Sequence, residues 1–217
     1  MTRLVLVRHG HVEGIKPERF RGRRDLPLTE RGKREAQAVA GHLAAVLRPT
    51  SLYTSPLARC MDTGRAIAQA CKLEAEILDD LADIDYGGWQ WKSYAEAQEA
   101  DPKLFQKWFT APHLMRFPSG ESLQDLVARS ADALRFVLDR HARDTVVLVS
   151  HDSVNRALLL QLLDQPLSAY WRLAQEPCCI NDIELLDGQV LVRCINATDH
   201  LVSMRRDGVP LKPPMPG

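Results

Sequence analysis

Two short apolar runs, each ending on a histidine, constrain the fold of this chain more than any other feature. Residues 4–7 read Leu-Val-Leu-Val and precede Arg8 and His9, while residues 146–150 read Val-Val-Leu-Val-Ser and precede His151. Runs of this length and composition are typical of buried strands. Because open α/β sheets bind ligands at the carboxyl ends of their strands, we predict an α/β fold with both histidines at the ligand-binding edge.

Periodicity, capping signals and turn residues predict the other elements. They are helices over residues 32–47, 94–100, 123–141 and 154–163, and strands over residues 52–54, 182–186 and 190–195, with the last two strands joined by a turn at Asp187-Gly188. Ser93 and Ser122 each stand three residues before an acidic residue, which is the capping-box pattern. Ser55-Pro56 is a helix-start signal, and it places Arg59 in a first turn where free backbone N–H groups favour an anion.

The composition favours one soluble domain and disfavours nucleic acid or a membrane as partner. The 217 residues include 28 basic and 28 acidic ones, so no net charge attracts a polyanion. No apolar run approaches the ~20 residues of a membrane span, and the signal-peptide pattern is lacking. Five cysteines without a Cys-x-x-Cys pair argue against a disulfide scaffold or a zinc site and favour the cytoplasm. We predict a single domain over residues 1–204 and a proline-rich tail over residues 205–217.

Four residues placed at element ends indicate a phosphate site. A lone histidine is more often structural than catalytic, but Arg8, His9, Arg59 and His151 each stand where a strand ends or a helix begins. Guanidinium groups match phosphate oxygens in geometry, and a neutral imidazole can act as a nucleophile. The basic loop that follows the first strand adds Arg21-Gly22 as a predicted contact for an anionic substrate.

Six ordered blocks of the chain together resemble the histidine phosphatase superfamily, in its phosphoglycerate mutase-like branch. The blocks are residues 6–10 (Leu-Val-Arg-His-Gly), 19–32, 55–63 (Ser-Pro-Leu-Ala-Arg-Cys-Met-Asp-Thr), 83–89 (Asp-Ile-Asp-Tyr-Gly-Gly-Trp), 120–122 (Gly-Glu-Ser) and 149–151 (Val-Ser-His). Because they keep their order and span most of residues 4–160, the resemblance is specific.

The resemblance implies a three-layer α/β/α fold around a mixed, largely parallel sheet. It implies that His9 attacks phosphorus to give a phosphohistidine, and that Arg8, Arg59 and His151 bind the phosphate oxygens. His9 must be neutral to attack, so its other ring nitrogen is expected to donate to a fixed acceptor. The resemblance implies no metal ion and no cofactor.

Departures from the family pattern leave the proton donor open. Asp83 stands where the family commonly has a glutamate that protonates the leaving alcohol, and Asp152 stands where the residue after the second histidine is commonly glycine. In the acid phosphatase branch a His-Asp pair supplies the proton, so Asp83 and Asp152 are rival donors, and a substrate-assisted or water route is the third alternative. Ile15 replaces a frequent asparagine, so a polar phosphate contact is expected to be lost.

The leading functional prediction is a phosphomonoesterase that hydrolyses a small phosphorylated metabolite. A phosphoglycerate mutase-type phosphotransferase is the rival, but residues 92–118, where such mutases add a Lys- and Arg-bearing segment, hold only four basic residues. A non-catalytic binder of a phosphorylated ligand is the third hypothesis, and the complete set of histidines and arginines disfavours it. Residues 84–120, which are rich in aromatic side chains, are predicted to form a lid-like insertion. A homodimer is a common assembly for such an enzyme, and the oligomeric state stays open.

Overall fold

A single six-stranded sheet organises the molecule. The computed structural model describes residues 1–186 and 188–202. The strands are β1 (Thr2–Arg8), β2 (Ser51–Thr54), β3 (Ala75–Ile77), β4 (Thr145–Ser150), β5 (Ile180–Leu186) and β6 (Gln189–Ala197). Their order is β3-β2-β4-β1-β5-β6; the first four are parallel, and β5 and β6 are antiparallel to their neighbours. The predicted mixed, largely parallel sheet is confirmed.

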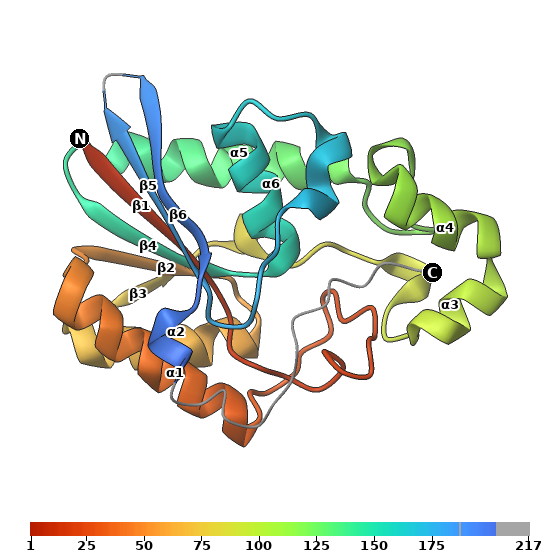
Figure 1. The fold of residues 1–217 in the computed structure, drawn as a ribbon, viewed down its shortest axis with the longest axis horizontal. Helices are drawn as coiled ribbons and strands as arrows, with labels where there is room; N and C mark the ends of the chain where they lie inside the picture. Colours follow the sequence, from red (N-terminus) through yellow and green to blue (C-terminus); the bar gives the residue numbers. More distant parts are fainter. Residues whose placement is uncertain (187, 203–217) are drawn as a thin grey trace.

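Successive side chains of the central strands point to opposite faces of the sheet, which produces two separate cores, one on each face. Leu4 and Leu6 of β1 belong to one core, and Val5 and Val7 belong to the other, as side chains of successive strand residues must. The first face is covered by α5 (Leu123–Arg140) and α6 (Asp152–Leu162), the second by α1 (Glu30–His42) and α2 (Ala58–Cys71). Figure 1 shows these helix layers on opposite sides of the sheet. The predicted three-layer architecture is confirmed.

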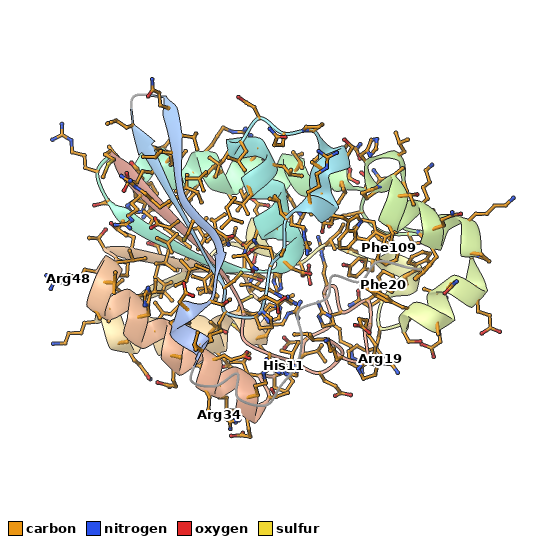
Figure 2. The ribbon with its side chains drawn as sticks, viewed as in Figure 1. His11, Arg19, Phe20, Arg34, Arg48 and Phe109 are labelled. Carbon is orange, nitrogen blue, oxygen red and sulfur yellow. The ribbon has the colours of Figure 1, made fainter. Side chains whose placement is uncertain are left out.

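The segment over residues 84–120 lies beyond the carboxyl ends of the parallel strands (Figure 1). It contains α3 (Tyr94–Ala100), α4 (Pro102–Thr110) and two 3₁₀ turns, η3 (Gly87–Trp89) and η4 (Pro112–Leu114). Its aromatic rings pack on one another around Phe20, whose ring centroid lies 5.0 Å from that of Trp89 and 4.9 Å from that of Tyr94. Phe20 and Phe109 both lie in this part of the molecule (Figure 2). The aromatic residues therefore form a core, and the action of this segment as a lid stays a prediction.

Local capping explains where several helices begin. Both capping boxes are present: Ser93 Oγ accepts from the Glu96 N–H, and Ser122 Oγ accepts from the Asp125 N–H. The helix α4 had not been predicted from periodicity, although Asp101 caps it. We find α6 to begin at Asp152, two residues earlier than predicted.

The predicted start of the second helix is wrong. The helix α2 begins at Ala58 after an uncapped Leu57, and Asp25 Oδ1 accepts from the Ala58 N–H at 2.8 Å. Ser55 is not the N-cap: its hydroxyl lies 2.8 Å from His151 Nε2 and accepts from the Leu57 N–H only at 3.4 Å. Arg59 nevertheless lies in the first turn, as predicted.

The carboxyl-terminal region is described only in part. Strands β5 and β6 pair antiparallel as expected, but Asp187 of the predicted Asp187-Gly188 turn lies outside the described residues, and so does the predicted tail over residues 205–217. In the described part of the chain, we find no helix that is both long enough and apolar enough to cross a membrane.

Two helical glycines provide a test of the packing of α2 on the sheet. A Cβ on Gly64 of α2 would collide with the Cγ2 atom of buried Thr54, whereas a Cβ on Gly41 of α1 would meet no atom within 4 Å. We expect Gly64→Ala to lower the free energy of unfolding by about 1–3 kcal/mol through overpacking. The matched Gly41→Ala should raise it by up to about 1 kcal/mol through helix propensity. Urea unfolding measures both, and equal effects of the two substitutions would contradict this account of α2 packing.

Candidate active site

The register of the parallel strands brings the two predicted histidines together. Arg8 pairs with Ser150, so the residues that follow, His9 and His151, leave the sheet side by side. The His9 N–H donates to the Ser150 carbonyl at 3.0 Å, and the two imidazole centroids are 5.3 Å apart. Ser55, at the end of the next parallel strand, donates its N–H to the Val149 carbonyl at 3.0 Å. Three strand ends therefore meet at one buried point.

Arg59 lies at the centre of the cluster that these strand ends form. Its Nε lies 3.2 Å from His9 Nε2 and 3.3 Å from His151 Nδ1. Its Nη2 donates to Asp83 Oδ2 at 3.0 Å. The side chain is 0% exposed, so the guanidinium has lost its hydration and depends on these partners.

Two backbone carbonyls of the basic loop complete the coordination of Arg59. Nη2 donates to the Gly22 carbonyl at 2.6 Å, and Nη1 donates to the Arg24 carbonyl at 2.8 Å. Gly22 has φ of +45°, and a Cβ there would lie 2.5 Å from Gln90 Oε1. The residue is glycine because the loop needs this left-handed conformation in a confined place. Gly22 thus belongs to the site through its carbonyl oxygen, which accepts from Arg59.

The hydrogen bonds fix the tautomer of His9, whereas His151 is bonded to a hydroxyl that can donate or accept. His9 Nδ1 lies 2.7 Å from the Gly10 carbonyl, which can only accept, so Nδ1 carries the proton and Nε2 is the free base that faces Arg59. His151 Nε2 lies 2.8 Å from Ser55 Oγ, while its Nδ1 faces Arg59. Burial, reinforced by the charge of Arg59, lowers the pKa of both imidazoles well below the ordinary histidine value. Both rings are therefore neutral at neutral pH.

Asp83 lies beside both Arg59 and His151, and its environment favours the protonated carboxyl. Burial raises the pKa of Asp83 above its ordinary value, the charge of Arg59 opposes that shift, and the negative charge of Asp152 adds to it. Oδ1 accepts from the Ile84 N–H and from the Ser153 hydroxyl. Oδ2 lies 3.6 Å from His151 Nδ1.

A second layer fixes the backbone of Asp83. Arg129 of α5 donates to the carbonyl oxygens of Asp83 at 3.0 Å and of Ala82 at 2.6 Å. Glu121 accepts from Arg129 at 2.8 Å and from the Asp85 N–H at 2.9 Å. The position of the carboxyl thus depends on α5 as well as on its own loop.

Asp152 has the opposite electrostatic environment. Its Oδ2 accepts from Arg156 Nη1 at 3.2 Å, and its Oδ1 lies 3.9 Å from Arg21 Nη2. Burial alone would raise the pKa of Asp152, but the guanidinium groups of Arg8, Arg156 and Arg21 outweigh burial and hold the pKa well below the ordinary aspartate value. Asp152 is therefore a carboxylate.

Arg8 extends the positive surroundings of His9. Its Nη1 donates to the Gln175 carbonyl at 2.5 Å, and its buried Nε has no partner among the described residues. Four guanidinium groups, of Arg8, Arg21, Arg59 and Arg156, face two carboxyl groups around two neutral histidines. The surplus positive charge suits a phosphate dianion. Within the described ranges, no group of three or more His, Cys, Asp or Glu residues is placed to hold a metal ion.

The structure brings together Arg8, His9, Arg59, His151 and Asp83, as the sequence predicted. Other contributors had not been predicted: Ser55 on His151, Ser153 on Asp83, and Arg156 on Asp152. The spacing of Asp152 and Arg156, four residues apart in a helix, is a signal that could have revealed that pair. No local signal marked Ser153, because its partner is 70 residues away.

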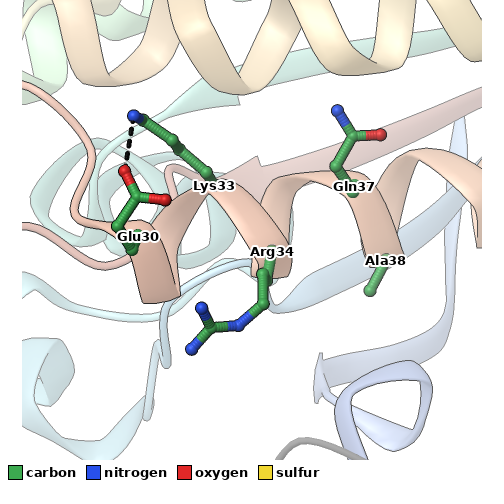
Figure 3. Close-up of a pocket in the computed structure, with 5 residues that line it drawn as sticks. All are labelled: Glu30, Lys33, Arg34, Gln37 and Ala38. Atoms are coloured by element: carbon green, nitrogen blue, oxygen red, sulfur yellow. Dashed lines mark hydrogen bonds and ion pairs between the residues drawn. The ribbon is translucent and has the colours of Figure 1, made fainter.

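Two hollows on the surface of the described residues lie away from the histidine cluster. One, of about 420 Å³, follows the exposed side of α1 and is lined by Glu30, Lys33, Arg34, Gln37 and Ala38 (Figure 3). The other, of about 520 Å³, is lined by residues around Trp91 and Glu96. Neither contains a residue of the histidine cluster, so the site is defined by its buried polar contacts.

The fold and this arrangement define an α/β protein in which two buried histidines are surrounded by arginines. The chain belongs to the histidine phosphatase superfamily (branch 1), whose family model matches residues 4–198. This confirms the predicted family.

Individual relatives agree with this assignment. The chain is 34% identical over 201 residues to phosphoserine phosphatase 1 of Hydrogenobacter thermophilus, covering 93% of this chain and 95% of that protein. It is 30% identical to the metal-independent phosphoserine phosphatase of Arabidopsis thaliana, covering 94% and 85%. It is also 31% identical to the probable phosphoglycerate mutase GpmB of Cronobacter sakazakii, covering 85% of each. The structure of Bacillus stearothermophilus YhfR superposes with a TM-score of 0.87 at 29% identity, covering 93% of this chain and 100% of that one. The predicted enzyme class, a phosphatase of small phosphorylated metabolites, is confirmed.

The lowered histidine pKa values predict a pH-dependent stability. An unfolded histidine binds a proton below about pH 6.5, whereas folded His9 and His151 resist protonation. Acidification therefore favours the unfolded state, and each histidine should cost about 1.4 kcal/mol of stability between pH 7.5 and pH 5.5. Urea unfolding at both pH values measures this loss in the free energy of unfolding. In His9→Gln the loss should be smaller than in the wild type by about that amount. An unchanged pH slope would contradict the neutral, buried imidazole.

Proposed function

We propose that the chain hydrolyses phosphate monoesters through a phosphohistidine on His9. The observation that carries this proposal is the orientation of His9, whose Nδ1 proton is fixed on the Gly10 carbonyl so that the Nε2 lone pair faces the arginine-lined centre. A neutral imidazole with a fixed tautomer is a nucleophile that needs no prior deprotonation.

In the first half-reaction, His9 Nε2 attacks phosphorus and the bond from phosphorus to the ester oxygen breaks. Arg8, Arg59 and His151 hold the non-bridging oxygens, on which charge accumulates. The bonds of Nη1 and Nη2 to the Arg24 and Gly22 carbonyls hold the planar guanidinium, so the Arg59 Nε–H, which lies between the two histidines, is a fixed donor for a phosphate oxygen that enters there. The leaving oxygen takes a proton and departs as an alcohol.

We assign the proton donor to Asp83 rather than to Asp152. A donor must hold its proton near neutral pH, and burial raises the pKa of Asp83, whereas three arginines hold the pKa of Asp152 low. In the second half-reaction the Asp83 carboxylate accepts a proton from water, water oxygen attacks phosphorus, and the P–N bond breaks. Inorganic phosphate leaves, and His9 and the protonated Asp83 are regenerated.

Transfer to water is favoured over the mutase alternative. Two relatives named phosphoserine phosphatases match this chain over 201 and 206 residues, whereas the relative named probable phosphoglycerate mutase GpmB matches over 184 residues. The few basic residues of the segment over residues 92–118 lie outside the histidine cluster, so this chain offers little there to hold a phosphorylated acid for re-phosphorylation. The proposed substrate is accordingly a small phosphorylated metabolite. All five cysteines are free thiols, which supports a cytoplasmic location.

The nucleophile is tested by His9→Ala. We expect loss of phosphatase activity toward p-nitrophenyl phosphate by at least about 1,000-fold, because the covalent route disappears. Acid-labile ³²P incorporation into the wild-type protein after rapid quenching should disappear with it. His113→Ala, on the turn η4, is the control that removes an imidazole elsewhere. Equal turnover by wild type and His9→Ala would refute the assignment.

The proton donor is tested by leaving-group dependence. Loss of the true donor slows esters of poorly acidic alcohols most, since a phenolate needs little protonation to depart. We expect Asp83→Asn to reduce kcat on glycerol phosphate by about 100-fold or more, and to reduce kcat on p-nitrophenyl phosphate much less. Asp152→Asn should leave the ratio of these two rates near the wild-type ratio. The reverse pattern would transfer the role to Asp152.

A further inference from the structure

Asp152 places a negative charge at the rim of a site built for an anion. Its side chain is 21% exposed, whereas that of Asp83 is 3% exposed and that of Arg59 is 0% exposed. It is the first residue of α6, directly after His151, and it remains ionised. A fixed carboxylate near a phosphate dianion opposes binding by like-charge repulsion. In the proposed hydrolysis this carboxylate holds no reacting atom, and its charge acts only by helping to raise the pKa of Asp83.

The neighbours of Asp152 have other partners besides its carboxylate. Arg156 already donates Nε to the Leu173 carbonyl at 2.7 Å, and its guanidinium lies 5.0 Å from the ring of Trp171 and 5.3 Å from that of Tyr170. Arg21 donates Nη1 to the Gly14 carbonyl at 2.8 Å. Both arginines are thus held by other contacts, and Asp152 lies between them.

The positive and negative side chains at the rim match a ligand that presents a negative group to the first and a positive group to the second. Arg21 Nη2 and Asp152 Oδ1 are 3.9 Å apart, too far for a hydrogen bond to each other but close enough to face adjacent groups of one small molecule. An α-amino acid presents an ammonium and a carboxylate on one carbon. An ammonium would satisfy the outward carboxylate, and a carboxylate would pair with the guanidinium.

We propose that Asp152 is a specificity-determining residue that binds the ammonium group of a phosphorylated amino acid while Arg21 binds its carboxylate. This inference rests on the proposed phosphatase function and names the substrate class of that site. Asp152 selects against leaving groups whose corresponding position is neutral or negatively charged.

Two substrates that differ in one group give the test. O-phosphoserine and 3-phosphoglycerate share the phosphate, the carbon chain and the carboxylate, and they differ in an ammonium or a hydroxyl on one carbon. We expect wild-type kcat/KM for O-phosphoserine to exceed that for 3-phosphoglycerate by at least tenfold. In Asp152→Asn, which keeps the shape and an acceptor oxygen but removes the charge, the ratio should fall at least tenfold toward unity. Asp132→Asn, a surface aspartate paired with Arg135, is the matched control and should keep the wild-type ratio.

The outcomes separate this inference from the proposed function. If wild type hydrolyses neither p-nitrophenyl phosphate nor any ester, the proposed function fails and the inference fails with it. If wild type hydrolyses esters but its O-phosphoserine to 3-phosphoglycerate ratio is near unity, or is the same in Asp152→Asn, the inference alone is overturned. Should Asp152→Asn not fold, the wild-type preference for O-phosphoethanolamine over 2-hydroxyethyl phosphate decides the ammonium contact, and a lack of preference refutes it.

Discussion

The buried guanidinium of Arg59 is the constraint on which the rest of the site depends. A charge with no exposed surface is costly unless every direction offers a partner. Here the partners come from two strand ends, from the carbonyl oxygens of the basic loop, and from Asp83 beyond the third strand. Each partner must therefore stay where the fold puts it. The need to satisfy one cation converts several independent segments into a single rigid arrangement.

The same positive surroundings set the ionisation of every other group in the site. Burial and guanidinium charge keep His9 and His151 neutral, which is the state in which an imidazole can act as a nucleophile. Asp83 is deep enough for burial to prevail over Arg59, whereas Asp152 lies nearer to the rim, where arginines prevail over burial. The pKa values of these two aspartates are thus shifted in opposite directions. When the environments of two carboxyl groups push their pKa values apart, one can act as an acid while the other stays ionised.

The aromatic segment supports the site from outside. Phe20 is 1% exposed among the rings of that segment, and the residues after it, Arg21 and Gly22, reach Asp152 and Arg59. Packing of one ring therefore positions the loop that holds the central cation. On the opposite side, Arg129 and Glu121 bind the backbone near Asp83. Side chains far from the histidine cluster thus determine its geometry, because protein interiors are close-packed and transmit strain.

The sequence by itself determined the features that depend on neighbouring residues. A strand that stops at Arg8, another that stops before His151, and a helix whose first turn holds Arg59 follow from local periodicity, and parallel pairing of the strands then makes the two histidines adjacent. It also indicated both candidate carboxylates without choosing between them. Where a local signal had two uses, the prediction failed: Ser55 reads as a helix cap, but its hydroxyl bonds to a histidine 96 residues away.

Only the tertiary structure decided in which direction the pKa of each carboxyl is shifted. The ionisation of Asp83 depends on Arg59, Ser153 and its depth of burial, and that of Asp152 depends on Arg8, Arg21 and Arg156, most of which are distant in the chain. The electrostatic energy of a pair falls with distance and rises as water is excluded. Neither quantity is encoded in residue order. Both are fixed only when the strands, the basic loop and the two helix layers enclose one point.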